Sequence, residues 1–252
     1  MFIDTHCHLN DKAFCGDVDA VLERAEAEGM DKVIIPGADP MELDLAIRLS
    51  EQRENVFFAV GIHPYDLHKG EIKYFLDSIK HPKCVAIGEC GLDYFRLPEE
   101  DIQGYKNQQK EKFEEQIQIA LDFDKPLILH VRESSNDVFE ILQKYPTARG
   151  VLHCFNADEI LLKLSDRFYY GIGGVCTFNN ARKIVEILPK IPRDRLLLET
   201  DAPYLTPVPF RGQRNEPSYI PIIAQKIADI LNLLPEDIEQ LTTQNAKNLF
   251  KF

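Results

Sequence analysis

The sequence predicts an α/β fold, a single (β/α)8 TIM barrel that spans residues 1–252. Two observations indicate this fold. Short apolar runs alternate with amphipathic stretches eight times along the 252 residues, which is the spacing of barrel units. Several runs end in a histidine or a carboxylate, and barrel enzymes carry such residues at the carboxyl ends of their strands. A doubly wound sheet is the alternative, but it favours a glycine-rich loop after the first strand. This chain has Thr5-His6-Cys7-His8 there.

The predicted strands are the short apolar runs between turn-forming residues. Val33-Ile34-Ile35 and Leu127-Ile128-Leu129 are continuously apolar, as expected of parallel strands that are covered on both faces. The eight predicted strands are Met1–Thr5, Lys32–Pro36, Val56–Gly61, Val85–Gly88, Pro126–His130, Gly150–His153, Phe168–Gly171 and Arg195–Glu199.

The amphipathic stretches between these strands predict helices. Several begin with Asp, Ser, Asn or Pro, which favour the first helical turn. Tyr94–Tyr105 instead predicts a loop that covers the substrate, since it is long and contains Pro98-Glu99-Glu100-Asp101. The predicted helices are Asp17–Glu28, Pro40–Gln52, Gln108–Phe123, Ser135–Lys144, Asp158–Ser165, Asn180–Leu188 and two within Ser218–Phe252, the second beginning at Pro235.

Composition excludes some classes of function. The net charge of −12 argues against a broad basic surface that coats nucleic acid. It permits an enzyme that acts on phosphates, because bound divalent cations reverse the local field. No apolar run approaches the roughly 18 residues of a membrane helix, and the first residues lack the pattern of a signal peptide. We therefore expect a cytoplasmic protein without a membrane partner, and the sequence leaves the oligomeric state open.

Two histidines follow the first predicted strand. Alternate side chains of a strand face the same way, so His6 and His8 should point together and form half of a divalent-metal site. The other expected ligands come at the ends of later strands, and all should meet on one rim of the barrel. These ligands are Glu89, His130, His153 and Asp201.

Six ligands exceed the four that one tetrahedral ion takes. The sequence therefore predicts two divalent ions per subunit, about 3.5–4 Å apart, as in hydrolases of phosphate esters. Zn, Mn, Fe or Co suits mixed nitrogen and oxygen ligation, and Mg fits when waters complete its shell. Glu89 is the expected bridging and catalytic carboxylate, and Asp201 the expected catalytic base. His6, His8 and Asp201 are expected to hold one ion, and His130 with His153 the other.

Six motifs follow one another along nearly the whole chain. They are Phe2-Ile3-Asp4-Thr5-His6-Cys7-His8-Leu9, Gly61-Ile62-His63-Pro64, Gly88-Glu89-Cys90-Gly91-Leu92-Asp93-Tyr94, Pro126-Leu127-Ile128-Leu129-His130-Val131-Arg132, Leu198-Glu199-Thr200-Asp201-Ala202-Pro203-Tyr204 and Arg211-Gly212-Gln213-Arg214-Asn215-Glu216-Pro217. In sequence and in order they resemble the motifs of the TatD family of metal-dependent hydrolases. The resemblance implies an amidohydrolase-type barrel with the same six ligands. It also implies 3′→5′ exodeoxyribonuclease activity on single-stranded DNA, with Mg, Mn or Zn. The alternative is D-aminoacyl-tRNA deacylation, and RNA is a further substrate to consider; a metal-binding regulator without turnover is a third class.

Polar and aromatic residues near the same strand ends are expected to contact the substrate. Guanidinium groups suit phosphate oxygens, a histidine can donate to them, and a tyrosine ring can stack on a base. Asp93 either orients a ligand histidine or caps its loop, and Glu199 is expected to orient a ligand. The predicted substrate contacts are His63, Arg132, Arg214 and Tyr204.

Overall fold

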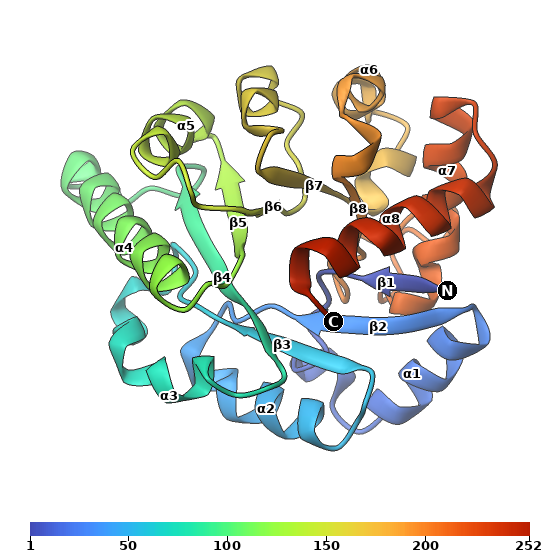
Figure 1. The fold of residues 1–252 in the computed structure, drawn as a ribbon, viewed down its shortest axis with the longest axis horizontal. Coiled ribbons are helices and arrows are strands. Elements are labelled where there is room, and N and C mark those ends of the chain that lie inside the picture. The colour runs from blue at the N-terminus through green and yellow to red at the C-terminus, as the bar shows by residue number, and fades with distance from the viewer.

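The computed structural model describes residues 1–252, the side chain of Tyr74 apart. Among the described residues, eight parallel strands form one sheet whose order follows the chain (Figure 1). The (β/α)8 barrel is thus confirmed, and each predicted strand overlaps an observed one. The strands are β1 Phe2–Asp4, β2 Met30–Ile35, β3 Val56–Val60, β4 Cys84–Asp93, β5 Leu127–Arg132, β6 Gly150–Leu152, β7 Phe168–Ile172 and β8 Leu196–Leu198.

Hydrogen bonds join the carboxyl ends of β1 and β8 and so close the ring. The Thr5 backbone N–H and hydroxyl both donate to the Leu198 carbonyl, at 3.1 and 2.9 Å. The Asp4 carboxylate accepts from the backbone and the hydroxyl of Thr200, at 3.0 and 2.6 Å. The first and last strands therefore deliver their following residues to the same place.

Helices surround the barrel, and the last of them lies across the ring of strands (Figure 1). Ala246, Leu249 and Phe250 of this helix, α8, belong to the same buried cluster as the inward-facing Ile3 and Ile34. The end of the barrel opposite the ligand-bearing rim is therefore closed by apolar packing. The helices are α1 Val18–Ala27, α2 Leu43–Glu51, α3 Leu76–Ile79, α4 Ile102–Asp122, α5 Ser135–Gln143, α6 Arg182–Ile187, α7 Ile220–Leu231 and α8 Pro235–Phe250.

The observed elements differ from the predicted ones at four places. β4 continues to Asp93, so Glu89 lies within the strand and not after it. α4 begins at Ile102, where the Asp101 carboxylate accepts from Gly104 N at 3.0 Å, and this shortens the predicted loop. The helix expected after β6 is a 3-10 helix, and α3 was not predicted. No helix within the described residues has the length and apolar character to span a membrane.

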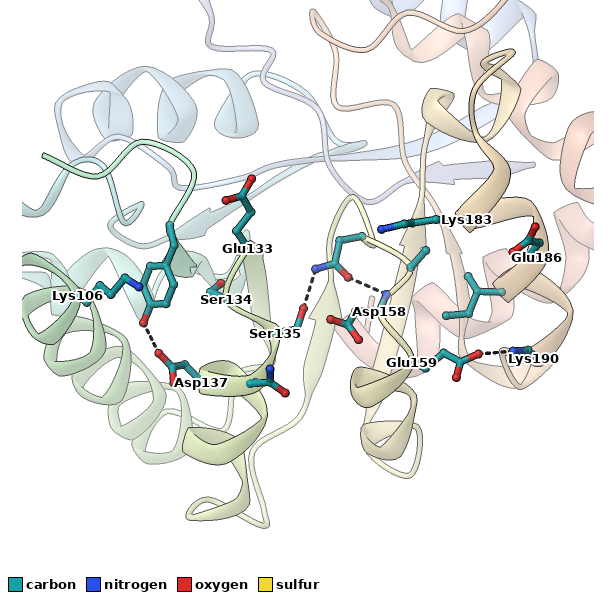
Figure 2. Close-up of a pocket in the computed structure, with 15 residues that line it drawn as sticks. Lys106, Glu133, Ser134, Ser135, Asp137, Asp158, Glu159, Lys183, Glu186 and Lys190 are labelled. Carbon is teal, nitrogen blue, oxygen red and sulfur yellow. Dashed lines mark hydrogen bonds and ion pairs between the residues drawn. The ribbon is translucent and has the colours of Figure 1, made fainter. Parts of the chain in front are cut away.

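Two cavities open at the rim where the strands end. The inner cavity, of about 840 Å³, reaches His130, His153 and Asp201. The outer groove, of about 880 Å³, lies between α5, the segment after β6 and α6 (Figure 2). The two share Asn156, Ala157 and Lys183. The rim is thus hollowed beside the predicted ligands.

Candidate metal centre

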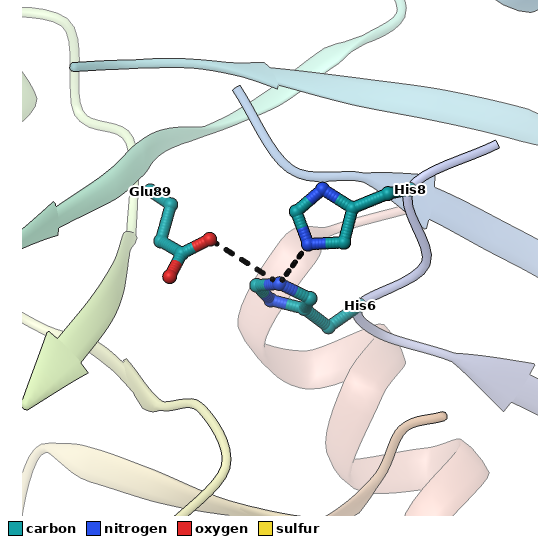
Figure 3. A group of neighbouring side chains, drawn as sticks. All are labelled: His6, His8 and Glu89. Carbon is teal, nitrogen blue, oxygen red and sulfur yellow. Dashed lines mark hydrogen bonds and ion pairs between the residues drawn. The ribbon is translucent and has the colours of Figure 1, made fainter. Parts of the chain in front are cut away.

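His6 and His8 point toward one another, as the sequence predicts. Their Nε2 atoms are 3.2 Å apart, and Glu89 faces them from β4 (Figure 3). Both residues lie beyond the last residue of β1, so backbone contacts hold them: Asp201 N donates to the His6 carbonyl at 2.9 Å, and His8 N donates to the Ala202 carbonyl at 2.8 Å. Closure of the barrel therefore brings this pair beside Asp201.

Glu89 is the extra residue of a β-bulge in β4. Gly88 pairs with Ile128, while Cys90 pairs with the next residue, Leu129. A Cβ on Gly88 would lie 2.6 Å from the Ile128 carbonyl oxygen, so only glycine permits this approach. The bulge turns the Glu89 side chain, 3% exposed as a residue, into the ring of histidines.

The two oxygens of Glu89 face different histidines. Oε2 lies 3.4 Å from His6 Nε2, and Oε1 lies 2.9 Å from both His130 Nδ1 and His153 Nε2. Burial raises the pKa of the Glu89 carboxyl, but His153, His130 and His6 outweigh this effect and hold the pKa well below its usual range. Glu89 is thus an ionised carboxylate with one oxygen on each side of the cluster.

Asp93 orients His130, and this is the first of the two roles that the sequence predicts for it. Its Oδ2 accepts from His130 Nε2 at 2.7 Å, which places the ring proton on Nε2 and leaves the Nδ1 lone pair directed at the cluster. Oδ1 accepts from the Tyr65 hydroxyl at 2.6 Å and from Phe95 N at 2.9 Å. Asp93 therefore caps its loop as well.

His153 lies beside Glu199 on its far side. Its Nδ1 is 3.8 Å from Glu199 Oε1, and Glu199 also accepts from Cys154 N. Burial raises the pKa of the Glu199 carboxyl to about 8. Burial lowers the pKa of His153, but Glu89 and other carboxylates outweigh it and raise the pKa to about 10. The carboxylates around His153 thus stabilise positive charge at this place.

Three overlapping groups of side chains offer ligand atoms within 4.8 Å of one another. Asp201 completes one of them: its Oδ1 lies 3.4 Å from His8 Nε2 and 3.6 Å from His6 Nε2. All six predicted ligands occur in these groups, together with His63. Because His6 belongs to two of the groups, the distances alone do not divide the ligands into two separate sets. The groups are His6, His8 and Glu89; His6, His153 and Asp201; and His63, Glu89 and His130.

The donor set fits divalent cations. Imidazole nitrogens and carboxylate oxygens are the ligands that Zn, Mn and related ions prefer. The His130 tautomer leaves a lone pair directed at Glu89. The carboxylates around His153 raise its pKa to about 10 and so stabilise positive charge beside Glu89, and a divalent ion would supply that charge. The site therefore suits metal better than protons.

His63 lies at the edge of the cluster, with Nε2 3.6 Å from Glu89 Oε1. Its Nδ1 accepts from Tyr65 N at 3.1 Å, and burial lowers the pKa of the imidazole to about 3. The neutral ring therefore carries its proton on Nε2, which then donates and cannot coordinate. This tautomer favours the predicted contact with substrate over a role as ligand.

The other predicted substrate contacts differ in their surroundings. Arg132 is exposed at the inner cavity, with its guanidinium 3.6 Å from the centre of the Phe95 ring. Tyr204 is 52% exposed at the same cavity, and its hydroxyl donates to Asp11 at 2.6 Å. Both remain accessible to a ligand.

Arg214 lies in an ion-pair network away from the ligand cluster. Its guanidinium donates to both oxygens of Asp17, at 3.0 and 2.6 Å, to Glu216 at 2.8 Å and to the Ala13 carbonyl at 2.6 Å. These bonds join the loop after β8 to the segment before α1. Because its donors are engaged in this way, we leave Arg214 out of the proposed substrate site.

Two residues that support the site were not predicted to do so. Tyr65 holds both Asp93 and His63, and its position directly after Gly61-Ile62-His63-Pro64 is the only signal in the sequence. Asp4 also accepts from His6 N at 3.2 Å. It stands two residues before His6, and therefore on the same face of an extended chain. That spacing could have identified it.

Comparisons with known proteins match nearly the whole chain. A family model described as TatD related DNase matches residues 3–251. Uncharacterized metal-dependent hydrolase YabD of Bacillus subtilis is 38% identical over 260 residues, covering 100% of this chain and 99% of that protein. The 3′-5′ ssDNA/RNA exonuclease TatD of Edwardsiella piscicida is 34% identical, covering 99% of each. The crystal structure of YjjV, a TatD homologue from Escherichia coli, superposes with a TM-score of 0.90 at 31% identity, covering 100% of this chain and 98% of that one.

Proposed function

Because the chain belongs to the TatD family of metal-dependent hydrolases, we propose that it removes nucleotides from the 3′ end of single-stranded DNA. The observation that carries the proposal is Glu89, whose two oxygens face His6 on one side and His130 with His153 on the other. One carboxylate between two sets of ligands is the arrangement of two-metal phosphodiesterases. The family description and the name of the Edwardsiella piscicida relative support DNA as the substrate.

The proposed ligands divide between two ions that share Glu89. His6, His8 and Asp201 would hold one ion, and His130 with His153 would hold the other. Bound divalent ions would supply a water that ionises near neutral pH and would neutralise phosphoryl charge. Mn and Zn suit this donor set, and Mg does so when waters complete its shell.

Three side chains of the chain perform the remaining chemistry in this proposal. Burial raises the pKa of the Asp201 carboxyl, but His8, His6 and His153 outweigh it and lower the pKa. Asp201 is therefore ionised and can accept the proton of the attacking water. His63 Nε2–H donates to a phosphoryl oxygen, and the exposed Arg132 pairs with a phosphate along the strand.

A labelled oligonucleotide tests this proposal. A single strand labelled at its 5′ end should shorten stepwise with Mn, Zn or Mg and stay intact with chelator. Glu89→Gln should lower kcat/KM by more than about 100-fold, since loss of a shared ligand exceeds the 10–100-fold effect of its supporting partners. Glu186→Gln, in the outer groove, is the matched control and should retain activity. No shortening with any of the three metals would refute the proposal.

D-aminoacyl-tRNA deacylation uses the same metals on an ester bond. Release of D-tyrosine from D-tyrosyl-tRNA, without shortening of DNA, would favour that reaction instead. A metal-binding regulator would hydrolyse neither substrate while still binding the ions. Replacing the DNA strand with RNA of the same sequence gives the sugar preference in the same gel assay.

A further inference from the structure

The inner cavity has two chemically different walls. The metal centre forms one wall with His130, His153 and Asp201. The opposite wall is apolar and comes from β7, the 3-10 helix Gly174–Thr177, α6 and the segments after β6 and β8. This apolar chamber is lined by Phe155, Ile172, Val175, Phe178, Ile184 and Leu205.

The apolar chamber has an aromatic side and a cationic mouth. The Phe178 ring is covered by the Arg211 guanidinium, 4.0 Å from the ring centre. Arg132, Arg182 and Lys183 also line the cavity, and all three are exposed. A ligand that fits both walls has an anionic group near the metals and the mouth, and a flat apolar body in the chamber. A nucleotide has this chemistry.

The outer groove disfavours continuation of a strand beyond the chamber. Among the described residues that line it, five carry a carboxylate and three an ammonium group (Figure 2). Glu159 and Lys190 there already pair with each other. Phosphates that entered the outer groove from the shared residues Asn156 and Lys183 would meet an excess of negative charge. The part of the inner cavity that a nucleic-acid strand can occupy therefore ends at the apolar chamber.

We infer that the apolar chamber is the subsite of the 3′-terminal nucleoside, with its 5′-phosphate at the metal centre. This inference rests on the proposed function and deepens it, because a subsite for one terminal nucleoside, with an acidic groove beyond it, accounts for action at an end. The apolar side chains that line the chamber offer contact surface to the faces of the base and no hydrogen-bonding side-chain group to its edge. Recognition is therefore by stacking and burial, which tolerate all four bases.

An abasic 3′ terminus tests this inference. Two oligonucleotides are compared, identical except that the terminal residue carries thymine or no base. Stacking of one base corresponds to about 5- to 150-fold in binding, so wild-type kcat/KM should fall by that factor for the abasic strand. Val175→Trp fills the chamber and should reduce this ratio to below about threefold while abasic ends are still removed. Leu45→Trp, on the outer helix α2, is the matched control and should keep the wild-type ratio.

The outcomes separate the inference from the proposed function. Equal wild-type rates on the two strands, or an unchanged ratio in Val175→Trp, would overturn the chamber as nucleoside subsite while the nuclease activity stands. Failure to shorten either strand would overturn the proposed function itself. Val175→Phe fills less of the chamber and replaces Val175→Trp if that variant does not fold. It should also lower the ratio of kcat/KM on the thymine-ended strand to kcat/KM on the abasic strand. Strands that end in each of the four bases should differ by only a few-fold, and a larger preference would count against recognition by stacking.

Discussion

Replacing Asp93 by asparagine should weaken metal binding without moving any ligand. In the wild type, Oδ2 accepts from His130 Nε2 at 2.7 Å, while Oδ1 accepts from Phe95 N at 2.9 Å and from the Tyr65 hydroxyl at 2.6 Å. All three neighbours donate. An asparagine offers one acceptor oxygen and one donor group, so one position must be filled by an amide that cannot accept.

Either orientation of the amide is unfavourable. If the NH₂ group faces His130, the ring proton moves to Nδ1, which then donates to Glu89 and cannot coordinate. If the NH₂ group faces Phe95, that partly buried N–H loses its acceptor, at a cost of about 1 kcal/mol. We expect a 10–100-fold loss of metal affinity and of kcat/KM, equivalent to about 1.4–2.8 kcal/mol.

Calorimetric titration of chelator-treated protein with Mn or Zn measures this loss directly, and the oligonucleotide assay measures it as rate. Asp137→Asn is the matched control, because Asp137 also accepts from a tyrosine hydroxyl, that of Tyr94, at 2.6 Å, but lies outside the ligand cluster. It should bind metal within about twofold of the wild type. Equal affinities of the two variants, with both folded, would refute the argument from the tautomer.

Three further outcomes are expected. Metal added to chelated protein should raise the unfolding temperature, because binding to the native state contributes about 2.7 kcal/mol at one hundred times Kd; an unchanged temperature at saturation would contradict a native metal site. Burial lowers the pKa of His63 to about 3, against about 6.5 unfolded. The unfolded chain therefore binds more protons between these values, and the metal-free protein should lose stability as the pH falls from 6.5 toward 3. His63→Asn should weaken this dependence of the unfolding free energy on pH, as measured by urea unfolding. An equal dependence in the wild type and the variant would contradict the prediction. Gly171→Ala places a Cβ 2.1 Å from Glu199 Oε2 and should cost about 1–3 kcal/mol of unfolding free energy. Gly173→Ala, whose nearest neighbour would be 3.4 Å away, is its control; similar losses in both variants would show that the contact with Glu199 is not the cause.

The fold could be predicted because its signals are local. Each apolar run is buried in the observed strand, as Leu127, Ile128 and Leu129 show at 0% exposure. Residues near the carboxyl ends of parallel strands must meet on one rim, so the six predicted ligands could be identified as a cluster before any contact was known. The short α3 and the early start of α4 escaped prediction, since their helical patterns are short or begin within a charged loop.

The sequence by itself determined the barrel and the set of residues that gather at its rim, because apolar periodicity and strand direction are properties of short segments. Only the tertiary structure decided how these side chains act. The bulge at Glu89, the proton positions on His63 and His130 and the pairing of Arg214 with Asp17, 197 residues away, depend on contacts between distant segments. Hydrogen-bond partners set the direction and protonation of a polar side chain, and those partners are fixed only when the barrel closes.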